Sequence, residues 1–312
     1  MRAALASANL RRESDRPTIS DSAAVMVRRA DGQQAVLKVA TSQNGMASLR
    51  REGDALDRLQ SDKRLGEWRA MLPVALDSGD ISGGSYLVTS RLPGVDGRQA
   101  TPDMMTWLTP AIVDAVGPLH LLDTAEHEVD AVLLGRLVEG PIAQLRATFR
   151  RTDGVDRLEA GLQADLAGRC VTLGWTHGDL ALGNVMVIGR RVTGIVDWGN
   201  VREHDLTILD LALWLLTVPG PGQPREIGAR VASRLRSDQA WLPAENRLLA
   251  ARSCGDPISG RALLLLAWLR HITDNLAKSD RYADSPVWSR RNVTRVLRVI
   301  DGHGDVATSD RP

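Results

Sequence analysis

A single strand-rich segment interrupts the helical second half of the chain. Residues 172–198 contain the string HGDLALGNVMVIGRRVTGIVDW, which predicts a loop followed by two short strands joined by a Gly-Arg-Arg turn. Around this segment the spacing of apolar residues predicts helices at about 103–123, 125–150, 155–168, 205–217, 223–236, 240–253, 258–278 and 287–300. An isolated hairpin among helices is a specific architecture, and it narrows the choice of folds.

The first 90 residues differ from the rest because strand patterns dominate there. Residues 17–40 read as strands, in which Ala23–Arg28 and Gln34–Ala40 form a hairpin around an Asp-Gly turn. A helix is predicted from Met46 to about Leu59 and a further strand at Ser85–Thr89, before the Pro- and Gly-rich string RLPGVDG. The sequence therefore predicts an α+β chain with a small antiparallel-sheet lobe at 1–90, a hinge at 91–97 and a larger, mostly helical lobe at 98–312.

Composition excludes several classes of protein. The net charge of +1 argues against a strongly basic nucleic-acid binder. The longest apolar run, Ala262–Leu269, is too short for a bilayer that needs about 20 residues, and the first residues lack the apolar core of a secretory signal. Cys170 and Cys254 match no metal-binding spacing, which favours buried reduced thiols. We therefore expect a cytoplasmic protein with no nucleic-acid or membrane partner.

The strand-rich segment also carries the residues with the clearest chemistry. His177-Gly178-Asp179 is followed by Asn184, and the predicted hairpin then leads to Asp197. Phosphoryl transfer needs a carboxylate that orients the acceptor hydroxyl and takes its proton, and oxygen ligands that hold Mg²⁺ against the nucleotide phosphates. A loop with an aspartate and an asparagine, and a second aspartate returned by a hairpin, supplies that set. The spacing D-x-x-x-x-N is the one found in the catalytic loop of protein kinases.

The two strings HGDLALGNVMV and GIVDWGN resemble the catalytic and metal-binding signature of the aminoglycoside phosphotransferase and choline kinase superfamily. The resemblance implies a bilobal protein-kinase-like fold and an enzyme that uses ATP, with GTP as the open alternative, and Mg²⁺. It implies that Asp179 is the catalytic base and that Asn184 and Asp197 are the Mg²⁺ ligands. In this family the equivalent of His177 holds the loop, although histidine could also act as a general base.

Lys38 lies among apolar residues of a predicted strand. A half-buried lysine costs several kcal/mol unless it is paired or meets an anion. The family's fold implies both: the α- and β-phosphates of the nucleotide, and Glu52 from the following helix. Asp54 is a nearby alternative partner, and a lysine that reaches water from an edge strand is the alternative without a ligand.

Weaker resemblances complete the predicted site. Ser20 and Ser22 stand where a loop should cover the phosphates, although no Gly-rich motif is present. Ser90 and Leu92 stand in the segment whose backbone meets the adenine in the family, without the usual acidic residue. Asp210 and His120 are assigned structural roles, as a helix cap or loop support and as a packing residue, and the role of Asp205 stays open.

The distribution of charge along the chain constrains the chemical class of the acceptor. Residues 215–312, the expected acceptor side, carry a net charge of +5, whereas the rest of the chain carries −4. A pocket for a polycationic aminoglycoside should be acidic, so a small neutral or anionic molecule or natural product is favoured as acceptor. Two alternatives remain. One is a Ser/Thr kinase for a ribosomally made peptide, working with a separate lyase, and the other is a nucleotide-binding regulator without turnover.

Overall fold

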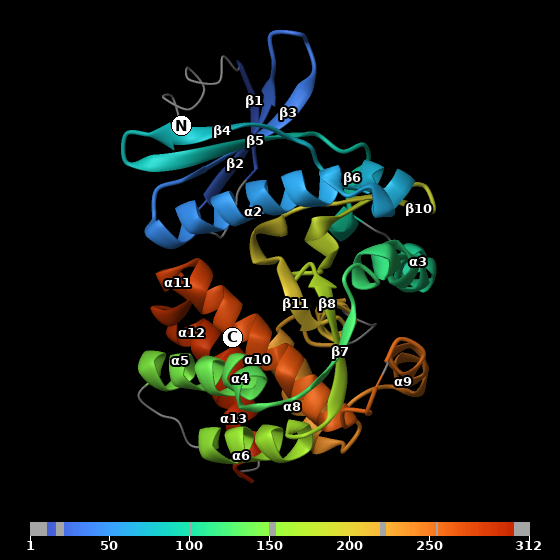
Figure 1. The fold of residues 1–312 in the computed structure, drawn as a ribbon. Coiled ribbons are helices and arrows are strands. Elements are labelled where there is room, and N and C mark those ends of the chain that lie inside the picture. Colours follow the sequence, from blue (N-terminus) through green and yellow to red (C-terminus); the bar gives the residue numbers. More distant parts are fainter. Residues whose placement is uncertain are drawn as a thin grey trace. The chain divides into compact units, whose positions relative to one another are not determined.

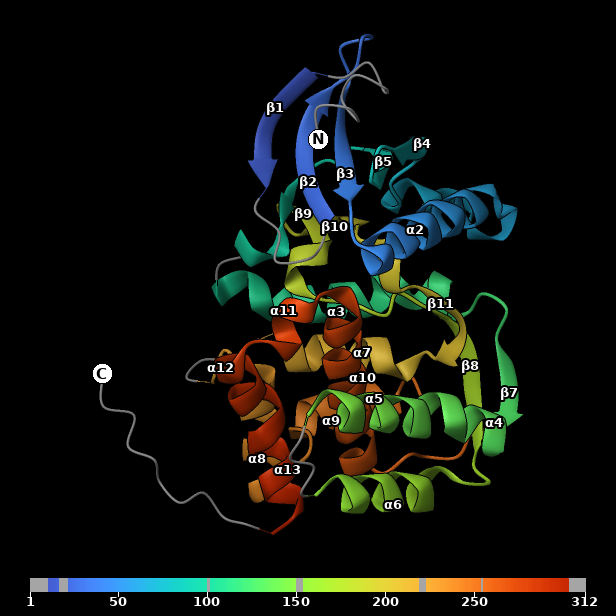
Figure 2. The same cartoon turned by 90° about the vertical axis from the view of Figure 1, so that its left-hand side faces the viewer.

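The chain is described by a computed structural model that covers residues 11–16, 22–99, 102–149, 154–218, 223–253 and 255–302, with backbone only at 11–16 and 102–106. These residues divide into two compact units (Figures 1 and 2). The first unit comprises Met1–Asp123 and Gly174–Asp205, and the second comprises Thr124–Leu173 and Leu206–Pro312. The predicted catalytic segment therefore belongs with the first unit. The functional boundaries expected at 1–90, 91–97 and 98–312 are not decided by this grouping and stay a prediction.

A five-stranded antiparallel sheet forms much of the first unit, with the strand order β1-β2-β3-β5-β4 (Figure 2). Its strands are β1 (Arg11–Arg16), β2 (Ser22–Arg28), β3 (Gln34–Ala40), β4 (Ala75–Ile81) and β5 (Gly84–Ser90). The hairpin and the strand before residue 90 follow the predicted pattern. The two outer strands, β1 and β4, were not predicted, because their polar sequences RRESDR and ALDSGDI lack a strand's apolar alternation.

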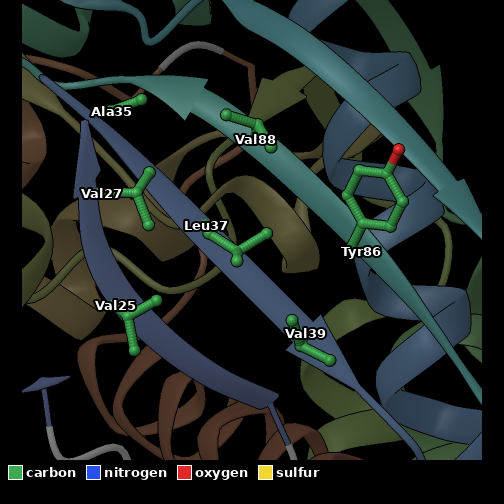
Figure 3. Close-up of a cluster of buried hydrophobic side chains, with 7 residues drawn as sticks. All are labelled: Val25, Val27, Ala35, Leu37, Val39, Tyr86 and Val88. Carbon is green, nitrogen blue, oxygen red and sulfur yellow. The ribbon is translucent and has the colours of Figure 1, made fainter. Parts of the chain in front are cut away.

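Because side chains alternate along each strand, the two faces of this sheet have different packing partners. One face carries a buried cluster, drawn in Figure 3, of Val25, Val27, Ala35, Leu37, Val39, Tyr86 and Val88. The opposite face carries Ala40 and Leu87, which pack against Leu49 of helix α2 (Gln43–Ser61). Lys38 pairs with Leu87 across the strands and so belongs to the face that α2 covers (Figure 1).

The rest of the first unit includes most of the predicted catalytic segment. It contains α3 (Pro102–His120), a sheet of order β10-β9-β6, and strand β11 (Arg202–Leu206), which reaches its boundary. The sheet strands are β6 (Val95–Asp96), β9 (Val185–Ile188) and β10 (Arg191–Ile195). Short 3₁₀ helices lie at Lys63–Met71, Gly97–Gln99, Leu182–Asn184 and Trp198–Asn200.

The second unit is mostly helical. Its helices are α4 (Ala131–Leu134), α5 (Gly140–Thr148), α6 (Val155–Leu166), α7 (Ile208–Thr217), α8 (Ile227–Arg236), α9 (Pro243–Ala250), α10 (Gly260–Lys278), α11 (Asp280–Ala283), α12 (Pro286–Ser289) and α13 (Arg295–Ile300), with π-helical turns at Gly135–Glu139 and Arg290–Thr294. The leucine-rich α10 is central, because it packs against α5, α6, α7 and α8 (Figure 2). Among the described residues, no helix combines the length and the apolar character needed to cross a membrane.

Three local predictions were wrong. Residues 125–128 form strand β7 (Ala125–Glu128) where a helix was expected, because they pair with β8 (Cys170–Thr176) from Ala125↔Leu173 to Glu128↔Cys170. That strand β8 itself stands where a loop was expected. Residues 202–206 form β11, so the helix expected from 205 begins only at Ile208. Cys170 is a free thiol but only partly buried, and Cys254 lies outside the described residues.

Candidate active site

Lys38 is held between two carboxylates of the first unit. Its Nζ lies 2.7 Å from both oxygens of Glu52 and 3.1 Å from Oδ1 of Asp197. The Glu52 side chain is only 3% exposed, whereas that of Asp197 is 49% exposed. The predicted pairing of Lys38 with the following helix is therefore present, and the alternative partner Asp54 is not needed.

The electrostatics of this cluster keep Lys38 charged. Burial by itself would lower the pKa of Lys38, but the charges of Asp197 and Glu52 and their hydrogen bonds outweigh it. The pKa of Lys38 consequently lies above its usual value, and the ammonium group persists at every physiological pH. One face of this cluster is buried and the other is open, so a fixed cation stands beside an accessible carboxylate.

Asp197 sits in a strained turn that is anchored by its neighbour. Its φ of 71° and ψ of 61° are left-handed, which is uncommon for a residue other than glycine. The next residue, Trp198, is fully buried, and its indole Nε1 donates to the carbonyl of Ile195 at 2.9 Å. The Trp198 ring also meets His177 edge-on at 4.7 Å between centroids. This anchoring of Trp198 fixes the backbone position from which the Asp197 side chain extends.

His177 holds the predicted catalytic loop through both ring nitrogens. Its Nδ1 accepts the backbone N–H of Asp179 at 3.2 Å, and its Nε2 lies 3.0 Å from the carbonyl of Val196. This pattern requires the neutral ring with the proton on Nε2. The side chain is fully buried, so the geometry favours the structural role over the general base.

Asn184 closes the loop onto Asp179. Its Nδ2 donates to the backbone carbonyl of Asp179 at 2.8 Å and lies 3.4 Å from Oδ2 of the Asp179 carboxylate. The N–H of Val196 donates to the carbonyl of Asn184 at 2.9 Å, which joins the end of the β9–β10 hairpin to the loop. The structure therefore places Asn184 against Asp179, and the residue before Asp197 against Asn184.

Gly178 is required by the same loop. Its φ is 77°, and a Cβ there would lie 2.1 Å from the carbonyl oxygen of Asn200. Any side chain would push apart the catalytic loop and the turn that carries Asp197.

The weaker predictions have mixed outcomes. Ser20 lies outside the described residues, and Ser22 begins β2 opposite Ala40. Ser90 exchanges two hydrogen bonds of 2.9 Å with the backbone of Val74, one through its N–H and one through its hydroxyl. Leu92 is buried, and its side chain fills the space above Gly194. Their roles toward a nucleotide stay predictions.

The role expected for Asp210 as a helix cap is wrong: it lies buried in the first turn of α7, and Thr207 occupies the cap position. Its expected role in supporting the loop, and the roles of Asp205 and His120, stay predictions. Asp205 is 2% exposed and its Oδ2 lies 3.9 Å from Nε of Arg202. His120 ends α3 and is partly buried.

The sequence did not indicate a role for two residues that contact the turn after Asp197. Nε of Arg51 and Oγ of Ser48, both on α2, lie 3.3 and 3.5 Å from the carbonyl oxygen of Gly199. Their spacing from Glu52 places all three on one helix face. That spacing is the sequence signal that could have identified them, but the local sequence does not indicate which residues this helix face contacts.

Comparison with solved structures relates the fold to known enzymes. A thermostable variant of the aminoglycoside phosphotransferase APH(4)-Ia, in ternary complex with ADP and hygromycin B, has a TM-score of 0.57 at 14% identity, covering 96% of this chain and 98% of that chain. The same enzyme with AMP-PNP and hygromycin B has a TM-score of 0.54 at 15% identity, covering 95% of each chain. The aminoglycoside phosphotransferase APH(3'')-Id from Streptomyces rimosus ATCC10970 has a TM-score of 0.50 at 21% identity, covering 84% of this chain and 93% of that chain. These likenesses confirm the predicted fold class.

No curated protein matches the chain. The model of the phosphotransferase enzyme family, APH, matches residues 19–245, which include both halves of the catalytic signature. The chain thus belongs to the APH phosphotransferase enzyme family.

Proposed function

We propose that this phosphotransferase is an ATP- and Mg²⁺-dependent kinase that transfers the γ-phosphoryl group to a hydroxyl of a small molecule or natural product. The observation that carries the proposal is the cluster of Lys38, Glu52 and Asp197 beside the Asp179–Asn184 loop. The cluster combines a fixed cation, an accessible carboxylate and a second carboxylate within one compact unit. Phosphoryl transfer needs this combination, since positioning and charge neutralisation dominate its catalysis.

Lys38 is assigned to the nucleotide phosphates. Its ammonium group is permanently charged and is oriented by Glu52, which is too buried to face a ligand itself. Solved relatives of the same fold bind ADP or AMP-PNP, which supports an adenine nucleotide as the donor.

Asn184 and Asp197 fit a magnesium ion. The amide Nδ2 of Asn184 is committed to Asp179, so its oxygen is the atom left to face a cation. Asp197 adds a half-exposed carboxylate. Carboxylate and amide oxygens, with few protein ligands, suit Mg²⁺, which is usually shared with substrate phosphates. Bound there, Mg²⁺ would supply neutralisation of the charge that the phosphates carry.

Asp179 is assigned to the acceptor. The hydroxyl oxygen of the acceptor forms a bond to the γ-phosphorus, the bond to the β–γ bridging oxygen breaks, ADP leaves and the hydroxyl proton passes to the Asp179 carboxylate. The hydrogen bond from the Asp179 N–H to His177 and the contact with Asn184 keep that carboxylate in place.

The acceptor is proposed to be neutral or anionic. The net charge of +5 over residues 215–312 would repel a polyamine sugar, although the solved relatives act as aminoglycoside phosphotransferases by name. A peptidic acceptor would suit the same charge and belongs in the same assay.

The test measures phosphate transfer from labelled ATP to panels of aminoglycosides, neutral sugars and nucleosides, carboxylated metabolites, and Ser/Thr-rich peptides. The proposal expects turnover in a non-aminoglycoside panel and loss of that turnover in Asp179→Asn. Efficient turnover of polycationic aminoglycosides, at about 10⁴ M⁻¹s⁻¹ or above, would contradict the proposed acceptor. Transfer that survives in Asp179→Asn would contradict the site.

A further inference from the structure

The carbonyl oxygen of Gly199 accepts hydrogen bonds from two side chains of the same helix, α2. Nε of Arg51 lies 3.3 Å away and Oγ of Ser48 lies 3.5 Å away. One turn of α2 also carries Glu52, whose Oε1 accepts the N–H of Trp198 at 3.4 Å. Three residues of α2 therefore contact two consecutive residues of the turn that follows Asp197.

This turn needs an external support. Asp197 adopts a left-handed backbone, which is strained in a residue with a Cβ and persists only where its surroundings impose it. The buried ring of Trp198 anchors the residue directly after Asp197. The carbonyl of Gly199 lies one residue further along the turn, and side chains of α2 hold it.

The approach between helix and turn is close enough to be specific. A Cβ on Gly199 would lie 2.3 Å from Oγ of Ser48, which is far inside van der Waals contact. A side chain at this position would displace the Ser48 hydroxyl from the Gly199 carbonyl, so glycine suits the contact.

We propose that Ser48 and Arg51 are positioning residues for the magnesium-binding carboxylate of Asp197, acting through the Gly199 carbonyl. The inference rests on the proposed function, because it assigns the residues a role in Mg²⁺ binding. Glu52 orients Lys38, and its neighbours on the same helix face orient Asp197. The helix α2 thus sets both the cation that meets the phosphates and the carboxylate that meets the metal.

The chain offers a matched control for this test. Arg50 is the neighbour of Arg51 on α2, and its guanidinium pairs with Asp80 at 3.1 Å in an exposed position. Arg51→Gln and Arg50→Gln change the same charge on the same helix, but only the first removes a donor to Gly199. Arg51→Lys keeps a charged donor, and Ser48→Ala removes the second donor.

The first readout is the Mg²⁺ concentration that gives half of the thermal stabilisation by AMP-PNP. We expect it to rise about tenfold in Arg51→Gln and further in the Ser48→Ala/Arg51→Gln pair, as when the outer partners of a metal ligand are lost. Arg50→Gln should match the wild type, and Arg51→Lys should recover most of the effect. The melting temperature without ligand should be nearly equal in all variants, because Arg51 is exposed and Ser48 only partly buried, so neither donor belongs to the core.

The second readout is amide hydrogen exchange of residues 196–202 in the ligand-free protein, which should quicken in Arg51→Gln and not in Arg50→Gln. Equal Mg²⁺ half-saturation and equal exchange in the two variants would overturn the inference. A wild-type protein that shows no Mg²⁺-dependent binding of AMP-PNP would overturn the proposed function, whereas the exchange experiment would still decide whether Arg51 holds the turn.

Discussion

Lys38 Nζ and the Glu52 carboxylate form a bidentate contact, with both oxygens at 2.7 Å. One partner is nearly inaccessible to solvent and the other is only 13% exposed. A buried pair of this kind is weak evidence of net stabilisation, but the loss of one partner leaves the other charge without compensation.

Removal of Lys38 alone should therefore destabilise the fold. In Lys38→Met the free energy of unfolding should fall by about 3 kcal/mol, because the buried Glu52 carboxyl group is left without this partner. The double variant Lys38→Met/Glu52→Gln should recover most of this loss. Urea denaturation of the two single variants and the double variant measures the coupling, and strictly additive losses would contradict the buried pair.

The pH dependence of this pair follows from the raised pKa of Lys38. A cation with a raised pKa contributes stability that is fully present below its unfolded value of 10.5 and is lost as the pH rises through the higher folded value. The difference in unfolding free energy between wild type and Lys38→Met should be constant from pH 7 to 10 and shrink above 10.5. A difference that already shrinks between pH 7 and 9 would show that Lys38 is not held by both carboxylates.

His177 should act through structure. His177→Leu keeps a similar volume but leaves the Asp179 N–H and the Val196 carbonyl without their buried partner. Each orphaned group costs about 1–3 kcal/mol, so urea denaturation should show a loss of about 2–6 kcal/mol for the two groups together. If stability were unchanged and the pH–rate profile lost its inflection near neutrality, His177 would instead be the general base.

The catalytic role proposed for Asp179 predicts a loss of chemistry without a loss of nucleotide binding. In Asp179→Asn the loop should persist, because Asn184 donates to the backbone carbonyl of residue 179. Nucleotide binding should be close to that of the wild type, whereas the transfer rate should fall by about 10²–10⁴-fold. Steady-state kinetics with the best acceptor, together with a nucleotide titration, measures both. A variant that loses binding and rate in equal proportion would point to a different role.

Sequence reasoning predicted the fold class, and it predicted a candidate site whose residues stay a prediction. Asp179, Asn184 and Asp197 lie within one short segment, so their spacing alone indicates a common site. Lys38 and Glu52 follow from a lysine in an apolar strand and the helix after it. Arg51 and Ser48 could not be found in this way, because their partner Gly199 is 148 and 151 residues away and depends on how α2 docks.

The helix wrongly expected at 125–128 has the same cause, a partner that is distant in the sequence. The string AEHE at 125–128 has local helix propensity, but β7 is imposed by pairing with a strand that begins at Cys170. There, tertiary pairing decided the element. The loop expected at VTLGWT has a different cause, because its β-branched and aromatic residues themselves favour the strand that forms.

Calorimetric titration of the protein with AMP-PNP, with and without Mg²⁺, tests the central claim most directly. The account predicts one bound nucleotide per chain in the presence of Mg²⁺ and binding weaker by about tenfold or more without it. Lys38→Met should lose most of the affinity, and Asp197→Ala should bind equally weakly whether or not Mg²⁺ is present. Absence of binding by the wild-type protein, or an unchanged Mg²⁺ dependence in Asp197→Ala, would contradict the assignment of this cluster as a nucleotide and magnesium site.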